Sequence, residues 1–556
     1  MRRILYSLLV LGLVLGAGGM RAAQAESPEK IKPVAIVAVA GYDALMADLT
    51  MLGQLSDWPD LPQNVEGAIK LFTWGRGLKG LDTTKPLGIL IQTDGEKYFG
   101  YALVPVTDAK ALYESLQPRL KGATDVGGGV YRVESPHGPL FAKVKDGWAI
   151  VSRKQEALAT APADPAKVLG HVTRRYQAGV RLYLDNIPAK DRGKLVAKLR
   201  ERIEKRMERC PVVNQHHGEI CQMIHKRMLD RFAAAADDLS RVGLGWTVNR
   251  QTHKTAVELS VTAREGTKTQ KRLAELDKAK SAFAGFQLPS AALAGDFSLH
   301  FPPPDDAELN ALFDTLRKHV EERINKKAPS AEKAEKAKQW AGQVLEVVRE
   351  TVKSGVIDGG GSLVLAPKAS TLVTGRSVAD SAKLEHVVKD VISTVQKNHP
   401  ERPKDVKFDA ETYEGIRLHT LTVVLPEKAK AHEKISRAFG DQINVVLGFD
   451  KTSVYLAAGK DAAPALKQAV AASKAAAGNA VPPVDIAVSL KDLTQFVAAV
   501  GNDRCKERAQ KTLAAVEKAP SGQDHIRLTV APKKNGVRYR LEFEEGAMRA
   551  MGTKRK

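Results

Sequence analysis

After its first residues the sequence lacks any apolar run that approaches the ~20 residues of a membrane-spanning helix, which argues against a transmembrane segment in the mature chain. It also lacks the G-x-S-x-G, H-E-x-x-H and EF-hand patterns, so no familiar hydrolase, zinc protease or calcium-binding class is indicated. No short-period repeat is present, which argues against solenoid and propeller architectures. These absences leave the fold and the compartment as the properties that the sequence predicts best.

Two glycine runs, 127–129 and 359–361, do not fit a phosphate-binding loop. Such a loop joins a strand to the N-terminus of a helix and ends in Lys followed by Ser or Thr. Both runs instead precede predicted strands, so we expect turns or β-bulges there. No set of Ser, His and Asp or pair of carboxylates stands out, and we expect no catalytic residues and no cofactor.

The N-terminus has the three parts of an export signal. Arg2 and Arg3 are followed by an apolar stretch over residues 4–16 and by Ala23-Gln24-Ala25, a small-x-small cleavage site. No cysteine follows the apolar stretch, which argues against a bacterial lipid anchor. We expect residues 1–25 to be removed and the chain to be exported to the periplasm or beyond; the alternative is an uncleaved anchor.

The charge is strongly positive, at +21 with a pI near 9.6. Residues 1–25 contain three arginines and no acid, so the mature chain would still carry +18. Such a charge favours polyanions, such as acidic envelope polymers or a membrane surface. Because the basic residues are spread along the chain, a solvated surface without a particular partner is the favoured alternative. Residues 551–556 are expected to form a basic tail, in which Lys554, Arg555 and Lys556 are frayed.

The chain contains one order of elements twice, over residues 26–270 and 294–550, with a linker at 271–293. Each copy closes with two further strands. The other predicted strands of copy one correspond to those of copy two as follows: 34–39 to 295–301, 88–91 to 361–365, 98–106 to 371–378, 129–133 to 415–419, 147–151 to 451–456, and 178–184 to 484–490.

Local signals support these elements. Asp108, Asp380 and the pair Asp305-Asp306 are placed as helix N-caps, and Asn535-Gly536 predicts a hairpin turn. Alternating strands with several helices predict an α+β fold: two tandem copies of an antiparallel-rich sheet, each with helices packed on one face. Copy one adds a protruding helical hairpin at about residues 190–240.

Several short runs in copy one are familiar. They are GLKGLDTTKPLG at 77–88, QTDG at 92–95, VPVTD at 104–108 and GWAIVS at 147–152. On these runs the chain resembles a group of exported planctomycete proteins of unknown function. The resemblance covers most of copy one and implies export and a duplicated α+β body. It implies no activity, and no functional residues are carried over.

Cysteine and histidine cluster at the tip of the predicted hairpin. The favoured interpretation is a disulfide between Cys210 and Cys221, because an exported chain meets an oxidising space and the two residues flank a short loop. The alternative is a soft-metal site that adds His216, His217 and His225 as ligands, although the spacing matches no standard zinc module.

The hairpin is also basic, which allows contact with a polyanion or membrane surface; the alternative is a solvated helical face with interleaved acids. It lacks aromatic residues for base stacking, so nucleic acid is not expected. The remaining cysteine, Cys505, is expected to be buried. The basic positions are Arg200, Arg202, Lys205, Arg206, Arg209, Lys226, Arg227 and Arg231.

The sequence therefore favours an exported, non-enzymatic envelope protein with a structural, scaffolding or binding role. Two alternatives stay open. One is a hydrolytic enzyme of an unrecognised class with one active copy, and the other is a metal-binding module at the hairpin tip.

Overall fold

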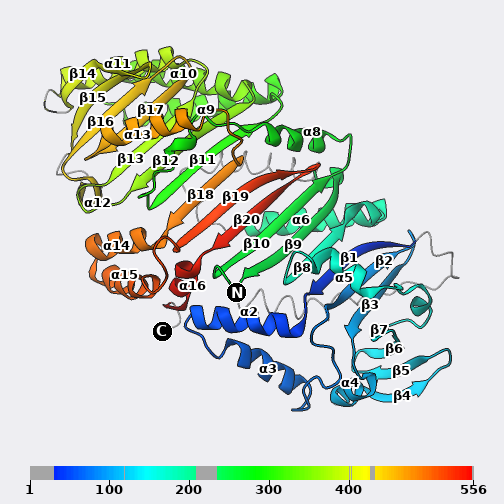
Figure 1. The fold of residues 1–556 in the computed structure, drawn as a ribbon. Helices are drawn as coiled ribbons and strands as arrows, with labels where there is room; N and C mark the ends of the chain where they lie inside the picture. The colour runs from blue at the N-terminus through cyan, green and yellow to red at the C-terminus, as the bar shows by residue number, and fades with distance from the viewer. Residues whose placement is uncertain are drawn as a thin grey trace. The chain divides into compact units, whose positions relative to one another are not determined.

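The computed structural model describes residues 31–117, 119–207, 235–399, 401, 403–425 and 432–553. These residues mix helices and antiparallel strands, which confirms the α+β class. They divide into two compact units, the first running through residue 269 and the second over residues 270–553 (Figure 1). The predicted Cys210–His225 cluster lies outside the described residues. The tail was predicted to begin at residue 551, but residues 551 and 552 belong to a helix that ends at Gly552, and residues 554–556 lie outside the described part.

The first unit is built on ten antiparallel strands in the order β4-β5-β6-β7-β3-β2-β1-β8-β9-β10. Its elements are β1 (Lys32–Val39), α2 (Tyr42–Leu55), α3 (Leu61–Phe72), β2 (Leu87–Thr93), β3 (Tyr98–Pro105), α4 (Ala109–Leu116), β4 (Lys121–Asp125), β5 (Val130–Ser135), β6 (Gly138–Lys145), β7 (Trp148–Ser152), α5 (Pro165–Thr173), β8 (Ala178–Tyr183), α6 (Ala189–Met207), β9 (Leu239–Asn249) and β10 (Lys254–Ala263). Helix α8 (Lys268–Glu275) follows.

The second unit has ten antiparallel strands in the order β14-β15-β16-β17-β13-β12-β11-β18-β19-β20. Its elements are β11 (Leu293–His300), α9 (Asp306–Lys327), α10 (Ala331–Lys353), β12 (Val356–Val364), β13 (Thr371–Ser377), α11 (Ser381–Asn398), β14 (Lys404–Tyr413), β15 (Ile416–Val424), α12 (His432–Phe439), β16 (Gln442–Phe449), β17 (Ser453–Gly459), α13 (Ala462–Ala475), β18 (Val484–Ser489), α14 (Leu490–Val500), α15 (Asp503–Val516), β19 (His525–Lys533), β20 (Gly536–Phe543) and α16 (Glu545–Gly552).

The strand orders of the two units correspond position by position, so that β4 is equivalent to β14, β3 to β13 and β1 to β11. Sequence analysis missed β4, β6, β14 and β16. The polar strands β4 and β14 pair with register irregularities and are largely exposed, so they carry little of the hydrophobic alternation that indicates a strand.

Helices cover both faces of each sheet, so the prediction that they cover one face was wrong. In the first unit Leu90 and Leu103 join a core cluster with α5, whereas their neighbours Ile91 and Val104 join clusters on the opposite face. Successive strand residues point to opposite faces, and here both residues of each pair are apolar.

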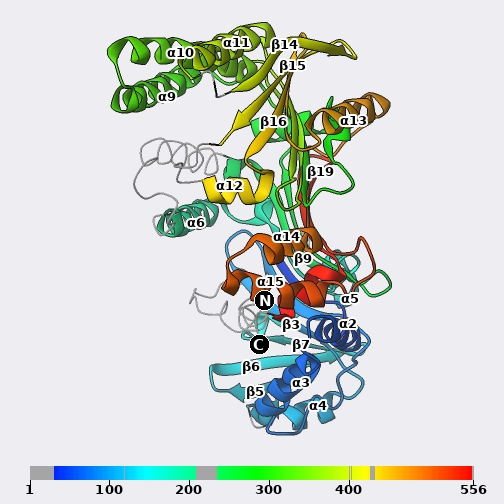
Figure 2. The same ribbon diagram turned by 90° about the vertical axis from the view of Figure 1, so that its left-hand side faces the viewer.

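The second unit shows the same arrangement, with α11 and α13 on opposite sides of the sheet (Figure 2). Leu418 of β15 shares a core cluster with Leu466 of α13. The strand's next residue, His419, hydrogen-bonds Glu385 of α11. Helices therefore pack against both faces of β15, with α13 on the side of Leu418 and α11 on the side of His419.

The glycine run 359–361 lies inside β12, so the predicted turn there was wrong. A Cβ on Gly360 would come within 2.8 Å of the backbone oxygen of Phe283. Phe283 and Phe286, in the segment predicted as a linker, are fully buried in the core of the second unit. Position 360 therefore needs glycine, because the segment that contains Phe283 and Phe286 packs directly against the backbone of β12 there. The run 127–129 forms the predicted turn, with all three φ angles positive.

The predicted N-caps are confirmed, since the carboxylates of Asp108, Asp305 and Asp380 accept hydrogen bonds from backbone N–H groups of α4, α9 and α11. The hairpin at Asn535 is also present, but Gly536 already pairs with Lys533, so the loop lies one residue earlier than predicted.

Candidate functional site

The residues that sequence analysis singled out are only partly described. Cys210, His216, His217, Cys221 and His225 lie outside the described residues, so the disulfide and the metal site stay predictions. The same holds for the later basic positions of the hairpin, namely Arg209, Lys226, Arg227 and Arg231, and nothing is described of the Arg206 side chain.

The described basic residues of the hairpin lie on α6, which is the first of its two predicted helices. Arg200 pairs with Glu204 at 3.0 Å, and Lys205 pairs with Glu201 at 2.6 Å, both one turn apart. Arg202 is exposed. Such pairs belong to a solvated helical face and contribute little to stability, because water screens both charges.

Cys505 is an exposed free thiol, so the prediction of burial was wrong. It lies in the first turn of α15, where its backbone N–H donates to Asn502 Oδ1 at 2.9 Å. Cys505 lies on the same helix face as the buried Ala509 and Val516, but it lies one turn before Ala509, where this face is exposed.

The densest group of titratable side chains in the described residues lies between α11 and the strands β14 and β15. Glu385 of α11 accepts from His419 Nε2 at 3.1 Å and from Lys389 Nζ at 2.9 Å, and Arg417 donates to its other side. Lys389 also contacts Asp409 at 3.0 Å. Two carboxylates therefore meet two cations and a neutral imidazole, and we call these five residues the Glu385 cluster.

Both nitrogens of His419 have protein partners. Nδ1 accepts from the backbone N–H of Asp409 at 2.8 Å, so the proton must be on Nε2, which donates to Glu385. The ring is 1% exposed. Burial and the charge of Lys389 lower the pKa of His419, which keeps the ring neutral.

The donors also determine the charge of Glu385. Burial raises the pKa of its carboxyl, but hydrogen bonds from Arg417 and Lys389 outweigh this and bring the pKa down to about 2. The carboxylate is thus ionised and has a donor on each oxygen.

Ligand atoms of Glu385, Asp409 and His419 lie within 4.8 Å of one another, which is close enough to surround a metal ion. The donor set does not fit, because a metal would have to replace a backbone N–H at His419 Nδ1 or a proton at Nε2. It would also lie beside two cations. The cluster is an internal ion-pair network that attaches α11 to the sheet.

A second group of acids lies at the centre of the second sheet. Asp296 of β11 faces Asp485 of β18 in register, and Gln287 donates to its Oδ2. Oδ1 has no hydrogen-bond partner among the described residues. Burial raises the pKa of Asp296 to about 6, with a further contribution from Asp485 and despite the Gln287 hydrogen bond.

A groove of about 290 Å³ lies over β14, β15 and β16, beside the N-terminus of α13. Its lining includes the polar residues Thr420, Thr422 and Asn444 and the lysines Lys407 and Lys460, together with apolar residues of β15, β16 and α13. Both lysines are exposed, and neither forms an ion pair with another residue in the described part of the chain. Asp405 is the acid in the lining.

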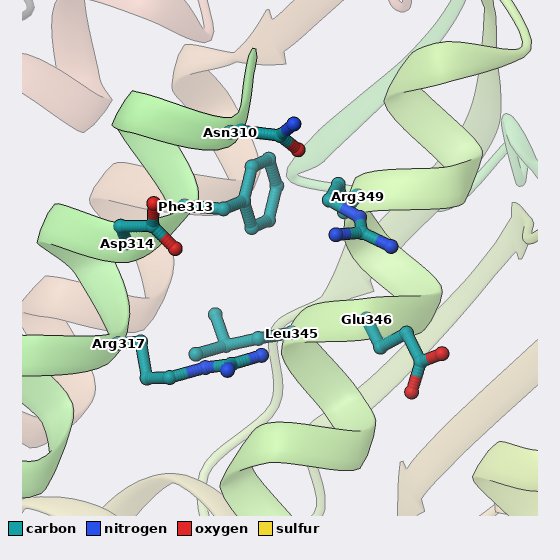
Figure 3. Close-up of a pocket in the computed structure, with 7 residues that line it drawn as sticks. All are labelled: Asn310, Phe313, Asp314, Arg317, Leu345, Glu346 and Arg349. Carbon is teal, nitrogen blue, oxygen red and sulfur yellow. The ribbon is translucent and has the colours of Figure 1, made fainter. Parts of the chain in front are cut away.

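A smaller hollow lies between α9 and α10, where Arg317 and Arg349 reach toward each other beside Phe313 (Figure 3). Its volume of about 20 Å³ is enough for about one water molecule and for no larger ligand. Asp314 and Glu346 also line it, so opposite charges balance there.

Comparison of the chain with protein-family models, curated proteins and solved structures finds no match. None of the helices in the described ranges is both long and apolar enough to cross a membrane. Of the features above, the groove over β14–β16 is the one with room for a ligand larger than a water molecule, and polar and basic residues are part of its lining. Sequence analysis missed it because its lining comes from separate strands.

Proposed function

We propose that this protein is exported and acts in the cell envelope by binding, and that the groove over β14–β16 takes an acidic, hydroxyl-bearing polymer such as an acidic polysaccharide. The observation that carries this proposal is a groove whose lining combines hydroxyl and amide side chains with two lysines that lack ion-pair partners within the described residues.

The chemistry of the groove suits such a ligand. The hydroxyls of Thr420 and Thr422 and the amide of Asn444 can donate and accept hydrogen bonds with sugar hydroxyls. Lys407 and Lys460 would attract carboxylate or sulfate groups, and the α13 N-terminus adds a partial positive charge. The net charge of +18 that remains without residues 1–25 would speed the encounter with a polyanion.

The Glu385 cluster supports binding over catalysis in this unit. A general acid or base needs a proton position that the substrate can reach. Here each nitrogen of His419 and each oxygen of Glu385 already has a protein partner, and both side chains are buried.

We also infer that the two units are copies of one folding unit. The shared order of ten antiparallel strands and the helices that follow β1 and β11, β3 and β13, and β7 and β17 support this. Superposition of the two units in an experimental structure tests it, and strands that could not be aligned in that order would contradict it.

Export is tested by fractionating the native cells and sequencing the N-terminus of the purified protein. A chain that begins at Glu26 and is recovered from the envelope or medium is expected. A chain recovered from the cytoplasm with residues 1–25 intact would overturn this part of the proposal.

The groove is tested by titrating polygalacturonate into the mature protein in a calorimeter at low salt. Lys407→Gln combined with Lys460→Gln should weaken binding about five- to tenfold, since exposed charge pairs contribute about 0.2–1 kcal/mol each. The matched control is Lys397→Gln with Lys518→Gln, two exposed lysines of the same unit that do not line the groove.

An equal loss in both double variants would show that net charge alone attracts the polymer. No binding by the unmodified protein would refute the ligand class.

A further inference from the structure

The C-terminus of α3 in the first unit presents three large apolar side chains to solvent within four residues. Leu71 is 78% exposed, Trp74 is 72% and Phe72 is 43%. Other exposed large hydrophobic residues in the described parts of the chain reach at most 46%. Single exposed apolar residues are common, but a contiguous group indicates a contact surface. We call these three residues the apolar tip.

The backbone at Trp74 is unfavourable for this residue type. Gly75 N–H donates to Lys70 O at 2.6 Å and Trp74 N–H donates to Leu71 O at 3.4 Å, which is the pattern of a helix ended by a left-handed residue. Trp74 is that residue, with φ of +52°. Glycine is usual there because a Cβ is strained. Burial of the indole does not offset the strain, since the side chain is exposed.

Hydrogen bonds of the neighbouring residues hold the backbone that carries the apolar tip. The buried Thr73 hydroxyl donates to Ile69 O at 2.9 Å and accepts from Gly77 N–H at 2.9 Å. Arg76 Nη1 donates to the backbone oxygen of Glu114 at 2.7 Å, which joins the loop to the end of α4. A preordered loop loses little conformational freedom when it binds.

The surroundings of the apolar tip are basic. The Arg119 guanidinium lies 5.3 Å from the centre of the Phe72 ring. Residues 61–79 and 109–121 contain six basic residues and two acids. The basic residues nearest the tip are Lys70, Arg76, Lys79 and Arg119, and all four are exposed.

We propose that the apolar tip inserts into the interfacial layer of an anionic phospholipid bilayer while the surrounding lysines and arginines contact the lipid phosphates. Trp and Phe are favoured at this depth, and basic residues beside them are attracted to anionic head groups. The charge of the surroundings selects a lipid surface over an uncharged apolar partner. The contact would hold the first unit on a membrane without a transmembrane segment.

The test is co-sedimentation of the mature protein with vesicles of equal parts phosphatidylglycerol and phosphatidylcholine, beside vesicles of phosphatidylcholine alone. The unmodified protein should bind the anionic vesicles, and the binding should weaken in 0.5 M salt, a test condition that screens charge. Trp74→Gly should raise the lipid concentration for half-binding about tenfold, the loss expected for one buried apolar side chain. Leu71→Ser should have a similar effect.

Trp74→Gly separates a binding role from a structural one, because glycine relieves the left-handed strain and the melting temperature should not fall. The control is Leu493→Ser, an exposed leucine of the second unit that should leave binding unchanged. Equal binding by the unmodified protein and Trp74→Gly would overturn the proposal, as would the absence of binding to anionic vesicles. Self-association that Trp74→Gly abolishes, without vesicle binding, would assign the tip to a second copy of the chain and also overturn it.

Discussion

Glu385 and Asp296 are two carboxyls of the second unit with nearly the same burial, at 6% and 5% exposed, but with pKa values of about 2 and about 6. Glu385 has hydrogen bonds from Arg417, Lys389 and His419. Asp296 has one donor, Gln287, and faces Asp485. Burial raises both pKa values, and Asp296 lies deeper among protein atoms than Glu385, so the depth of burial and the number and charge of the donors together decide which carboxyl is ionised at neutral pH.

The largest effect should come from Glu385→Gln, which removes the carboxylate bound by Arg417 and leaves Lys389 with Asp409 alone. We expect the free energy of unfolding to fall by about 2–3 kcal/mol at pH 7, reduced from the cost at a fully buried pair because both cations are partly exposed. Urea denaturation followed by circular dichroism measures it.

The control for Glu385→Gln is Asp409→Asn, which removes a half-exposed carboxylate from the same lysine and should cost less than about 1 kcal/mol. The pKa of Glu385 is lowered on folding, so its contribution is present above about pH 4 and is lost as the pH falls toward 2. If the Glu385→Gln and Asp409→Asn proteins were equally stable at pH 7, the buried carboxylate of Glu385 would contribute no more than the exposed one of Asp409, contrary to our account.

Asp296→Asn should have the opposite sign, raising the free energy of unfolding by about 1–3 kcal/mol at pH 8. The asparagine oxygen can still accept from Gln287, and its amide gains Asp485 as an acceptor across the strands. The folded pKa lies above the unfolded value, so the contribution of Asp296 is complete below about pH 4 and is lost as the pH rises through 6.

The gain from Asp296→Asn should therefore disappear in acid. Asp485→Asn is the matched control, because Asp485 pairs with Arg527 at 2.7 Å and its loss should destabilise the protein. A less stable Asp296→Asn protein at pH 8 would contradict our account of this carboxyl.

Asp48→Asn in the first unit should give the smallest effect, a gain of about 1 kcal/mol or less at pH 8. Burial raises the pKa of Asp48 to about 6, although Arg250 lies 3.1 Å away and opposes the shift. Neither carboxylate oxygen has a hydrogen bond among the described residues, but the substitution also removes the charge that pairs with Arg250, and this limits the gain. Thermal unfolding at pH 5 and pH 8 measures the difference, and equal gains at both would exclude a titration effect.

The local signals predicted their elements well. The N-caps at Asp108, Asp305 and Asp380 form between residues two or three apart, so a short window of sequence contains everything that they need. The strands missed at β4 and β14 are polar and irregular, and the assignment of helices to one face failed because both residues of pairs such as Leu90 and Ile91 are buried against helices.

The Glu385 cluster depends on contacts that no local window contains. Glu385 and His419 are separated by 34 positions and meet because α11 lies across β15. One signal was available, since Glu385 lies on the same helix face as the buried Ser381 and Ile392. A charged residue on the buried face of a helix requires a partner, but the sequence pattern does not show which residue is the partner. Trp74 had no such signal, because its residue type favours burial.

The sequence by itself determined the mixed α+β class, most strands and their turns, and the helix caps, because hydrophobic alternation and short-range hydrogen bonds are encoded locally. Only the tertiary structure decided which carboxyls gain donors, which side chains line the groove and that Trp74 faces solvent. These properties depend on the distances between segments far apart in the chain, and the free energy of a buried charge changes by several kcal/mol with the groups that surround it.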